Sequence, residues 1–147
     1  MEIRIEKILE SDFEQLLVLF SEFAEFEKLP YKMVNTLEKM KEESEFFNGF
    51  TVKNNQGEIL GYVTFFYAYY TWMGKSLYMD DLYIRPQFRG LGLGTKLISE
   101  VISFAKANKC NKLRWQVSNW NEPAISFYKS LGAEIDAVEN NCDLILN

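Results

Sequence analysis

Two adjacent carboxylates in an apolar stretch are the side chains of this sequence best suited to acid–base chemistry. Asp80 and Asp81 lie in the segment "YMDDLY", whose composition is typical of a β-strand. A carboxylate among apolar neighbours costs free energy unless it is paired or has a function. Because side chains alternate along a strand, the sequence predicts that the two carboxylates point to opposite faces of a sheet. A structural alternative stays open, in which one of them bonds a neighbouring backbone N–H or caps a β-bulge.

The absence of histidine narrows the chemistry further. The 147-residue sequence contains no histidine, which excludes Ser-His-Asp and Cys-His nucleophiles, HExxH zinc sites and histidine general bases. Any proton transfer has to use a carboxylate, tyrosine, lysine, a backbone group or water. A primary amine has a pKa of about 10.4, so its neutral form at pH 7 costs roughly 4.6 kcal/mol, and a site that acts on amines must help to remove a proton.

A glycine-rich segment, "RGLGLGTK", follows the predicted strand. Its spacing does not fit the Walker motif GxxxxGK[ST], because Thr95 separates Gly94 from Lys96. A dinucleotide fingerprint, GxGxxG, would require glycine in place of Thr95. The pattern R/Q-x-x-G-x-G/A is met by Arg89, Gly92 and Gly94.

This pattern has the physical features of a pyrophosphate site. Glycines let successive backbone N–H groups converge, and a helix beginning near Thr95 adds unsatisfied N–H groups with a partial positive charge. Arg89 and Lys96 can add charge-assisted hydrogen bonds. The alternative is a glycine-rich connection that binds no ligand.

Composition and charge restrict the partners. The formal net charge is −5 and the sixteen Lys and Arg residues are scattered, which argues against a nucleic-acid partner and fits a cationic small molecule better. Cys110 and Cys142 lack CxxC spacing, so neither a disulfide framework nor a zinc site is expected, and no metal is predicted. There is no signal-like amino terminus and no apolar window of about 18 residues. These features predict a cytoplasmic protein without a membrane partner.

Hydrophobic periodicity predicts strands and helices that alternate along the chain. The expected strands lie within residues 2–8, 46–70 (a hairpin around "KNNQG"), 76–84, 112–117, 133–138 and 143–147. The expected helices lie within residues 11–26, about 35–44, about 95–105 and 121–131. The expected helix boundaries are caps at Ser11 with Glu14, at Asn35 with Glu38 and at Asn121, and a left-handed stop at Gly132.

This order of elements predicts an α/β (α+β) fold. The expected architecture is a mixed, mostly antiparallel central sheet of about six or seven strands with helices on both faces. No internal repeat, low-complexity tract or linker interrupts the sequence. Residues 1–147 are therefore predicted to form a single domain.

Two segments together carry a family resemblance. "LYMDDLYIRPQFRGLGLGTKLI" and, further along the chain, "VSNWNEPAISFYKSLGA" resemble the GCN5-related N-acetyltransferase (GNAT) superfamily. Within it the sequence is most similar to the diamine acetyltransferases, which acetylate spermidine, spermine or thialysine. The resemblance covers nearly the whole chain, and it implies a GNAT-type fold, acetyl-CoA as cosubstrate and a single N-acetyltransferase domain.

The resemblance also implies which residues contact the cosubstrate. Arg89, Gly90, Leu91, Gly92, Leu93, Gly94 and Thr95 are expected to bind its pyrophosphate. Backbone groups of Leu82, Tyr83 and Ile84 are expected to receive the pantetheine arm and the acetyl carbonyl. An oxyanion would be held by an N–H near Leu82 or Tyr83 if the strand splays there. Asn121 is expected to contact the cosubstrate, and Tyr128 to lie beside its sulfur.

The catalytic roles implied by the resemblance belong to Asp80 and Tyr128. Similar family members have a glutamate at the position of Asp80, which accepts the amine proton, and the shorter aspartate here favours transfer through a water. Tyr128 resembles the family's general acid, which protonates the leaving thiolate. Asp81 has either a substrate-binding role or the structural one given above.

The acceptor is expected to be a small cation. Glu27 in "EFEKLP" matches an acidic family position near the amine channel, and Trp72 can offer cation–π contact to an ammonium. Polyamine-type relatives carry an acidic residue just before this Trp, whereas Thr71 stands there in this chain. A polyamine, a diamine or a thialysine-like amino acid remains possible, as do a protein-directed acetyltransferase and a non-catalytic acyl-CoA-binding module. The resemblance also implies a homodimer, with the aromatic run "FFYAYYTW" as a candidate contact.

Overall fold

The structure is a computed structural model that describes residues 1–146, and they divide into two compact units. The first unit runs from Met1 to Gln116 and contains the sheet and three α-helices. The second unit begins at Val117 and contains one α-helix, α4 (Glu122–Ser130). That residues 1–147 form a single functional domain stays a prediction.

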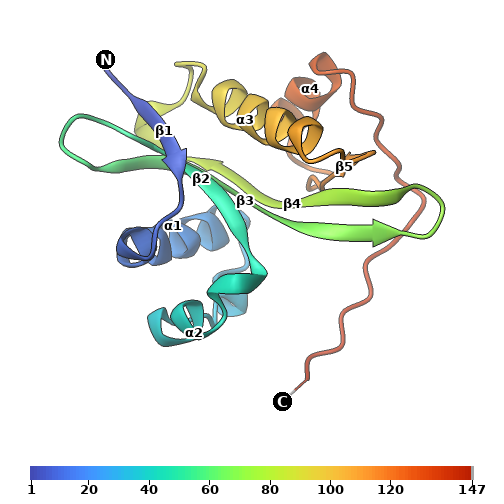
Figure 1. The fold of residues 1–147 in the computed structure, drawn as a ribbon, viewed down its shortest axis with the longest axis horizontal. Coiled ribbons are helices and arrows are strands. Elements are labelled where there is room, and N and C mark those ends of the chain that lie inside the picture. The colour runs from blue at the N-terminus through green and yellow to red at the C-terminus, as the bar shows by residue number, and fades with distance from the viewer. Residues whose placement is uncertain (147) are drawn as a thin grey trace. The chain divides into compact units, whose positions relative to one another are not determined.

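The sheet of the first unit has five strands in the order β1-β2-β3-β4-β5. Neighbouring strands from β1 to β4 are antiparallel, and β5 pairs with β4 in parallel. Both long strands belong to one hairpin, which extends beyond the rest of the sheet (Figure 1). The strands are β1 (Arg4–Lys7), β2 (Asn48–Lys53), β3 (Ile59–Tyr70), β4 (Gly74–Ile84) and β5 (Leu113–Arg114).

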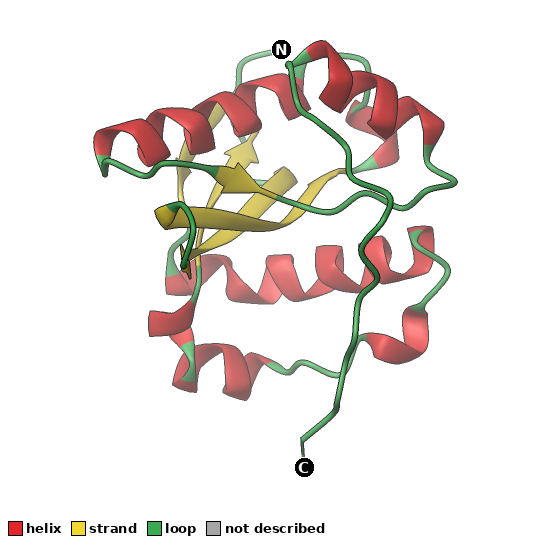
Figure 2. Ribbon diagram, turned by 90° about the vertical axis from the view of Figure 1, so that its right-hand side faces the viewer, coloured by secondary structure: helices red, strands yellow, loops and turns green. Residues whose placement is uncertain are grey.

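Helices cover both faces of this sheet, as expected for the predicted fold class. Helices α1 (Phe13–Phe26) and α2 (Leu37–Glu42) lie on one face, and α3 (Leu93–Ala107) lies on the other (Figures 1 and 2). Short 3-10 turns connect some of these elements.

Period-two alternation along β3 supplies apolar side chains to both faces. Tyr62 is fully buried among residues of α1 on one face, and Phe65 packs against Phe104 of α3 on the other, with ring centroids 5.0 Å apart. Burial on both faces makes β3 the centre of the first unit. The strand therefore holds its neighbour β4, which carries the two aspartates, in a fixed register.

Two helix starts differ from the prediction, while the cap at Asn121 is confirmed. Asp12, rather than Ser11, precedes α1, and its carboxylate accepts a hydrogen bond from the Leu9 N–H at 2.8 Å. Thr36, rather than Asn35, caps α2 by accepting the Lys39 N–H at 3.1 Å. In both cases several polar residues in a row can serve as caps, and the tertiary position of the helix selects one of them.

The end of the chain differs from the prediction as well. Gly132 ends α4 in the left-handed conformation, with φ of 88°, as expected. The two strands predicted within 133–138 and 143–147 are not formed over 133–146, and Asn147 lies outside the described residues. Val138 and Leu144 are exposed, so the alternating pattern there has no partner strand to pair with. This is why the described sheet has five strands instead of six or seven.

Candidate active site

Strand β4 changes its environment halfway along its length. It pairs with β5 only at Leu77 and Tyr78, where the Leu77 N–H donates to the carbonyl of Lys112 at 2.9 Å. From Met79 to Ile84, no strand in the part of the chain that the structure describes pairs with this side of β4. We call this stretch the unpaired edge of β4. It contains both aspartates.

A β-bulge begins at the same place. Thr64 of β3 is opposite Asp81, and Phe65 is opposite Met79, which leaves Asp80 as an extra residue. The Asp81 N–H donates to the hydroxyl of Thr64 at 3.3 Å. A bulge interrupts strict alternation. The regular alternation from which we predicted opposite faces for Asp80 and Asp81 is therefore not present at these two residues. The structural alternative is met only in part: the two aspartates lie at a bulge, but the carboxylate of Asp81 accepts a hydrogen bond from the Tyr62 hydroxyl and not from a backbone N–H.

Alternation of N–H groups shows which of them face the unpaired edge. The Arg85 N–H donates to the carbonyl of Leu60 at 2.9 Å, and the Asp81 N–H is also directed to β3. Successive N–H groups of a strand point to opposite sides. The N–H groups of Leu82 and Ile84 therefore face the unpaired edge, whereas that of Tyr83 faces β3.

The carboxyl of Asp81 has an unusual environment. Burial raises its pKa to about 7, and the charges of Asp80 and Glu27 act in the same direction. A hydrogen bond from the Tyr62 hydroxyl to Asp81 Oδ2, at 2.8 Å, opposes this rise. Asp80 is exposed as a residue, but partial loss of hydration raises the pKa of its carboxyl too. The pair therefore binds a proton more readily than isolated aspartates do.

Glu27 completes a group of three carboxylates, Glu27, Asp80 and Asp81, which we call the acidic cluster. Glu27 is the half-buried residue that directly follows α1, and its charge acts on Asp81. The sequence prediction named all three residues, and the structure brings them together. Like charges held this close create a negative potential that favours an ammonium group.

The glycine-rich segment forms the start of α3. Gly90 and Gly92 have φ of 80° and 78°, a region that favours glycine, and Gly92 is the residue that precedes the helix. The first helical hydrogen bond runs from the Lys96 N–H to the Gly92 carbonyl at 3.1 Å. The N–H groups of the first turn, at residues 93–95, therefore have no acceptor within the helix. Helix α3 begins at Leu93, two residues before the position that the sequence indicated.

The geometry of this helix start suits an anion. Gly92 offers no side chain that could cap the first turn. A Cβ atom built on Gly90 or Gly92 would meet no atom within 4 Å, so the space beside the two residues is open. Free N–H groups, a helix dipole and open space together are the features of a phosphate site.

Arg89 has a different arrangement from the expected one. Its Nε donates to the carbonyl of Ile84 at 2.8 Å, and its guanidinium lies over the rings of Phe26 and Tyr83, at 4.8 and 5.6 Å from their centroids. The side chain thus links the end of α1 to the end of β4. In this conformation the Arg89 side chain positions the glycine-rich segment and is directed at Ile84, Phe26 and Tyr83 instead of the first turn of α3.

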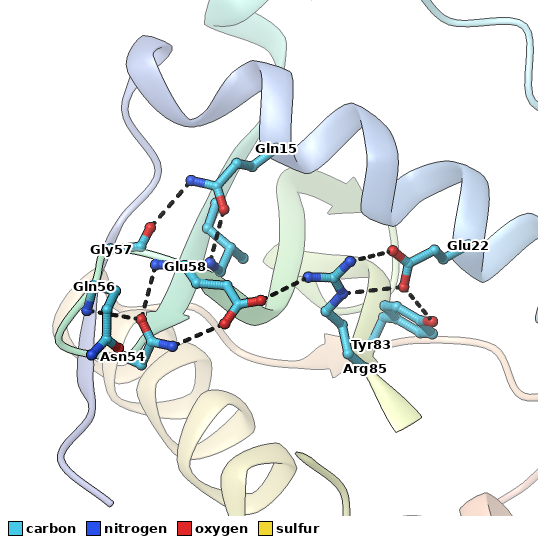
Figure 3. Close-up of polar contacts among 9 residues, drawn as sticks. Gln15, Glu22, Asn54, Gln56, Gly57, Glu58, Tyr83 and Arg85 are labelled. Carbon is cyan, nitrogen blue, oxygen red and sulfur yellow. Dashed lines mark hydrogen bonds and ion pairs between the residues drawn. The ribbon is translucent and has the colours of Figure 1, made fainter. Parts of the chain in front are cut away.

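A network of ion pairs, which sequence reasoning missed, anchors the end of β4 to α1. Arg85 contacts the carboxylate of Glu22 at 2.8 and 3.3 Å and that of Glu58 at 3.4 Å (Figure 3). The Tyr83 hydroxyl donates to Glu22 at 3.2 Å. The network holds β4 just before the glycine-rich segment. No local pattern pairs Glu22 with Arg85, because 63 residues separate them.

The remaining predicted residues lie elsewhere. Asn121 accepts the Ala124 N–H at 3.4 Å as the cap of α4, and Tyr128 is in the same helix, its ring 5.4 Å from that of Phe127. Trp72 is 100% exposed at the tip of the β3–β4 hairpin. Six residues of strand, roughly 20 Å, separate Tyr70 at that tip from Thr64 beside the bulge. The structure therefore does not bring Trp72 to the acidic cluster of its own chain.

A cavity of about 280 Å³ lies at another place in the first unit. Its lining includes the rings of Phe13, Phe50 and Phe104, together with polar side chains such as that of Lys7. None of the predicted site residues lines it. The acidic cluster and the helix start of α3 are separate from this cavity.

Comparison with known proteins identifies the family. Residues 5–133 match the model of the "Acetyltransferase (GNAT) family". Over 142 residues the chain is 34% identical to a thialysine N-epsilon-acetyltransferase of Mus musculus, covering 89% of this chain and 84% of the relative. It is 41% identical over 120 residues to the corresponding protein of Caenorhabditis elegans, covering 80% and 74%. The chain belongs to the GNAT family of acetyltransferases, and it is an N-acetyltransferase.

Solved structures agree with this fold. An aminoglycoside acetyltransferase from an uncultured soil metagenomic sample, in complex with sisomicin, superposes with a TM-score of 0.81. The two chains are 20% identical, and 97% of each is covered. The mixed sheet with helices on both faces is thus the GNAT fold, and the resemblance stated from the sequence is confirmed.

Among the described residues, no helix combines the length and the apolar character that crossing a bilayer requires. In the same residues, no group of three or more His, Cys, Asp or Glu side chains is arranged to hold a metal ion.

Proposed function

We propose that the protein transfers an acetyl group from acetyl-CoA to the primary amine of a small cationic acceptor. The observation that carries the proposal is the unpaired edge of β4, which combines two outward N–H groups with the acidic cluster. The thialysine acetyltransferase relatives support an amine as acceptor. The negative potential of the cluster supports a cationic one.

The residues present fit acetyl-CoA as cosubstrate. The first-turn N–H groups of α3, within the segment 89–95, would bind the pyrophosphate, because they lack helical acceptors and face open space. The N–H groups of Leu82 and Ile84 would bond the pantetheine arm and the acetyl carbonyl. When bound, the cosubstrate supplies an acetyl thioester. Asn121 and Tyr128 are proposed as further contacts, on the family resemblance.

Proton removal from the acceptor ammonium is assigned to the aspartate pair. Asp80, the more exposed member, would accept the proton through a water, while Asp81 and Glu27 hold the cation in place. The neutral amine nitrogen then attacks the carbonyl carbon, and the N–H of Leu82 stabilises the oxyanion. The C–S bond breaks, and the thiolate takes a proton from the Tyr128 hydroxyl. The attacking nitrogen loses its second proton to water, and Tyr128 regains a proton from water. The products are an amide and free CoA.

The candidate acceptors fall into two classes: thialysine-like amino acids and short diamines on one side, and long polyamines on the other. A thialysine-like amino acid or a diamine presents an ammonium to the acidic cluster and a second polar group beyond it. Thr71 argues against a long polyamine as acceptor, because polyamine-type relatives carry an acidic residue at this position, just before Trp72. We therefore place thialysine-like amino acids and short diamines before long polyamines.

A screen of amines tests the proposal. The protein is incubated with acetyl-CoA and a panel of thialysine, lysine, ornithine, diamines, polyamines and a lysine-containing peptide, and free thiol is detected. Release of thiol with small amines supports the proposal, and release with the peptide alone would favour a protein-directed enzyme. No release, together with acetyl-CoA binding by isothermal titration, would overturn it in favour of a non-catalytic binding module.

A homodimer and a cytoplasmic location are proposed with it. The hairpin tip exposes Tyr69, Trp72 and Met73, which is apolar surface that a second copy could cover. A role of Trp72 in acceptor binding then requires the tip of one copy to reach the acidic cluster of the other. Size-exclusion chromatography with light scattering tests this, and a monomer at micromolar concentration would contradict it. Both cysteines are free thiols, which suits a reducing compartment.

A further inference from the structure

Tyr62 of β3 is a buried residue that none of the steps above uses. Its side chain is fully buried, yet its hydroxyl donates to Asp81 Oδ2 at 2.8 Å. A buried phenol needs a hydrogen-bond partner, but a main-chain carbonyl would satisfy it as well as a carboxylate does. Here the partner is a member of the acidic cluster.

The packing around Tyr62 makes this contact rigid. The ring of Phe20, on α1, meets the Tyr62 ring edge-on with centroids 5.0 Å apart, and the ring of Tyr83 lies 6.1 Å away. On the other side of the contact, the Asp81 main chain is held by the Thr64 hydroxyl. Both partners are thus fixed by the sheet and by α1.

The phenol remains a donor over the whole working pH range. Burial raises the pKa of Tyr62 well above its usual value, and the negative charges of Asp81 and Asp80 act in the same direction. Tyr62 therefore stays protonated and acts as a hydrogen-bond donor. Its contribution is a fixed O–H dipole directed at one oxygen of Asp81.

We propose that Tyr62 is a positioning residue for acetyl transfer, which holds Asp81 Oδ2 so that the aspartate pair stays ionised and its remaining oxygens face the acceptor ammonium. The inference rests on the proposed function, because it concerns the same aspartates. It adds a residue whose effect is exerted only through Asp81.

The charges around Asp81 determine the sign of the effect. Asp80 on the same strand and Glu27 at the end of α1 both favour the protonated form of Asp81, as does burial. The Tyr62 hydroxyl on β3 favours the ionised form. Tyr83 also faces Tyr62, and Glu22 of α1 is hydrogen-bonded to Tyr83 and Arg85. Among these groups the Tyr62 hydroxyl is the one that donates to Asp81, so its removal must raise the pKa of the pair.

The test is Tyr62→Phe, which removes one oxygen and keeps the ring. The rate constant kcat/KM is measured from pH 5 to 9 with acetyl-CoA and the best amine of the screen. The acidic limb of the pH profile should shift to higher pH by about one unit. At pH values on this limb, kcat/KM should therefore be about tenfold lower than that of the wild type. Activity should recover towards that of the wild type as the pH rises.

Tyr67→Phe is the matched control. Tyr67 is on the same strand, is 45% exposed and lies towards the hairpin tip, so its hydroxyl is remote from Asp81. Its removal should leave the limb where it is in the wild type. A carboxyl titration by ¹³C NMR in both variants gives a second measurement that needs no turnover, and Asp81 should titrate at higher pH only in Tyr62→Phe.

The outcomes separate the inference from the proposed function. An active Tyr62→Phe variant whose acidic limb and carboxyl titration both match those of the wild type overturns the inference and leaves the proposed function standing. A uniform loss of activity at every pH, with an unchanged carboxyl titration, overturns it too, since that would be a structural effect. A wild-type protein without any transferase activity overturns the proposed function itself.

Discussion

The two halves of β4 differ in how their edges are paired, and this difference places the site. From Gly74 to Tyr78 the strand is paired with β3 throughout, and at Leu77 and Tyr78 also with β5. From Met79 to Ile84 its one partner among the described strands is β3, and the strand contains a bulge. Main-chain N–H groups that would bond a further strand in a complete sheet therefore stay available to a ligand. The two aspartates lie at the bulge, where regular alternation of side chains is interrupted. The chemistry is thus expected at the point where regular pairing ends.

The largest effect should come from the carboxylate in the unpaired half. Asp80→Asn removes the proposed proton acceptor and keeps the shape of the side chain, so kcat should fall by about a hundredfold or more. Lys75→Gln, in the paired half of the same strand, should change kcat by less than about twofold. Steady-state kinetics with a small amine measures both. Equal kinetics for Asp80→Asn and the wild type would remove Asp80 from the mechanism.

A smaller effect is expected at the helix start that serves the same edge. Gly92→Ala places a Cβ on a residue with φ of 78°, which costs about 1–2 kcal/mol and shifts the first turn of α3. The affinity for acetyl-CoA, measured by isothermal titration, should fall by about tenfold.

Gly57→Ala is the control for this strain. Gly57 has the same φ of 78° and the same free space, but it lies in the turn between β2 and β3. It should lose comparable stability and no affinity for acetyl-CoA. If both variants bind the cosubstrate equally well, the helix start does not form the pyrophosphate site.

The smallest effect concerns stability and its dependence on pH. The pKa of Asp81 is raised to about 7 in the folded protein, above that of an unfolded aspartate. The folded state therefore binds more protons between about pH 4 and pH 7, and the free energy of unfolding falls as the pH rises through this window. Asp81→Asn removes this loss, which is about 4 kcal/mol for a shift of this size, but its buried amide has a burial cost of its own, so the variant should be more stable than the wild type at pH 8 by about 1–2 kcal/mol.

Urea unfolding at pH 5 and pH 8 measures this change. The advantage of Asp81→Asn should be smaller at pH 5, where Asp81 of the folded wild type is largely protonated. Glu25→Gln, which neutralises an exposed carboxylate on α1, should show no such difference between the two pH values. An Asp81→Asn protein that is less stable at pH 8 would show that the charged form of Asp81 is stabilised in the fold.

The features that were predictable from sequence are those encoded by neighbouring residues. The glycine-rich segment, the helix after it, the hairpin and the Asn121 cap each follow from a few adjacent residues. Asp80 and Asp81 were also singled out, because carboxylates in an apolar strand are conspicuous, whereas Glu27 came from the family resemblance, and the roles of all three stay predictions.

The features that were missed, or in the case of the bulge only left open, depend on register between distant segments. The bulge at Asp80 is a property of how β3 and β4 align, and either strand alone shows only regular alternation. The same holds for the contact between Tyr62 and Asp81 and for the ion pair between Glu22 and Arg85. The strands expected after Gly132 are not formed over residues 133–146. The alternating pattern was present in the sequence there, but a strand also requires a partner strand, which a local pattern does not reveal.

Amide hydrogen exchange by NMR, with and without acetyl-CoA, tests the central claim most directly. The Leu77 N–H, bonded within the sheet, should be protected in both states. The N–H groups of Leu82 and Ile84 should become clearly slower to exchange when acetyl-CoA binds, because it occupies the unpaired edge. If acetyl-CoA binds and the exchange of Leu82 and Ile84 does not change, the unpaired edge of β4 is not where the acetyl group is held.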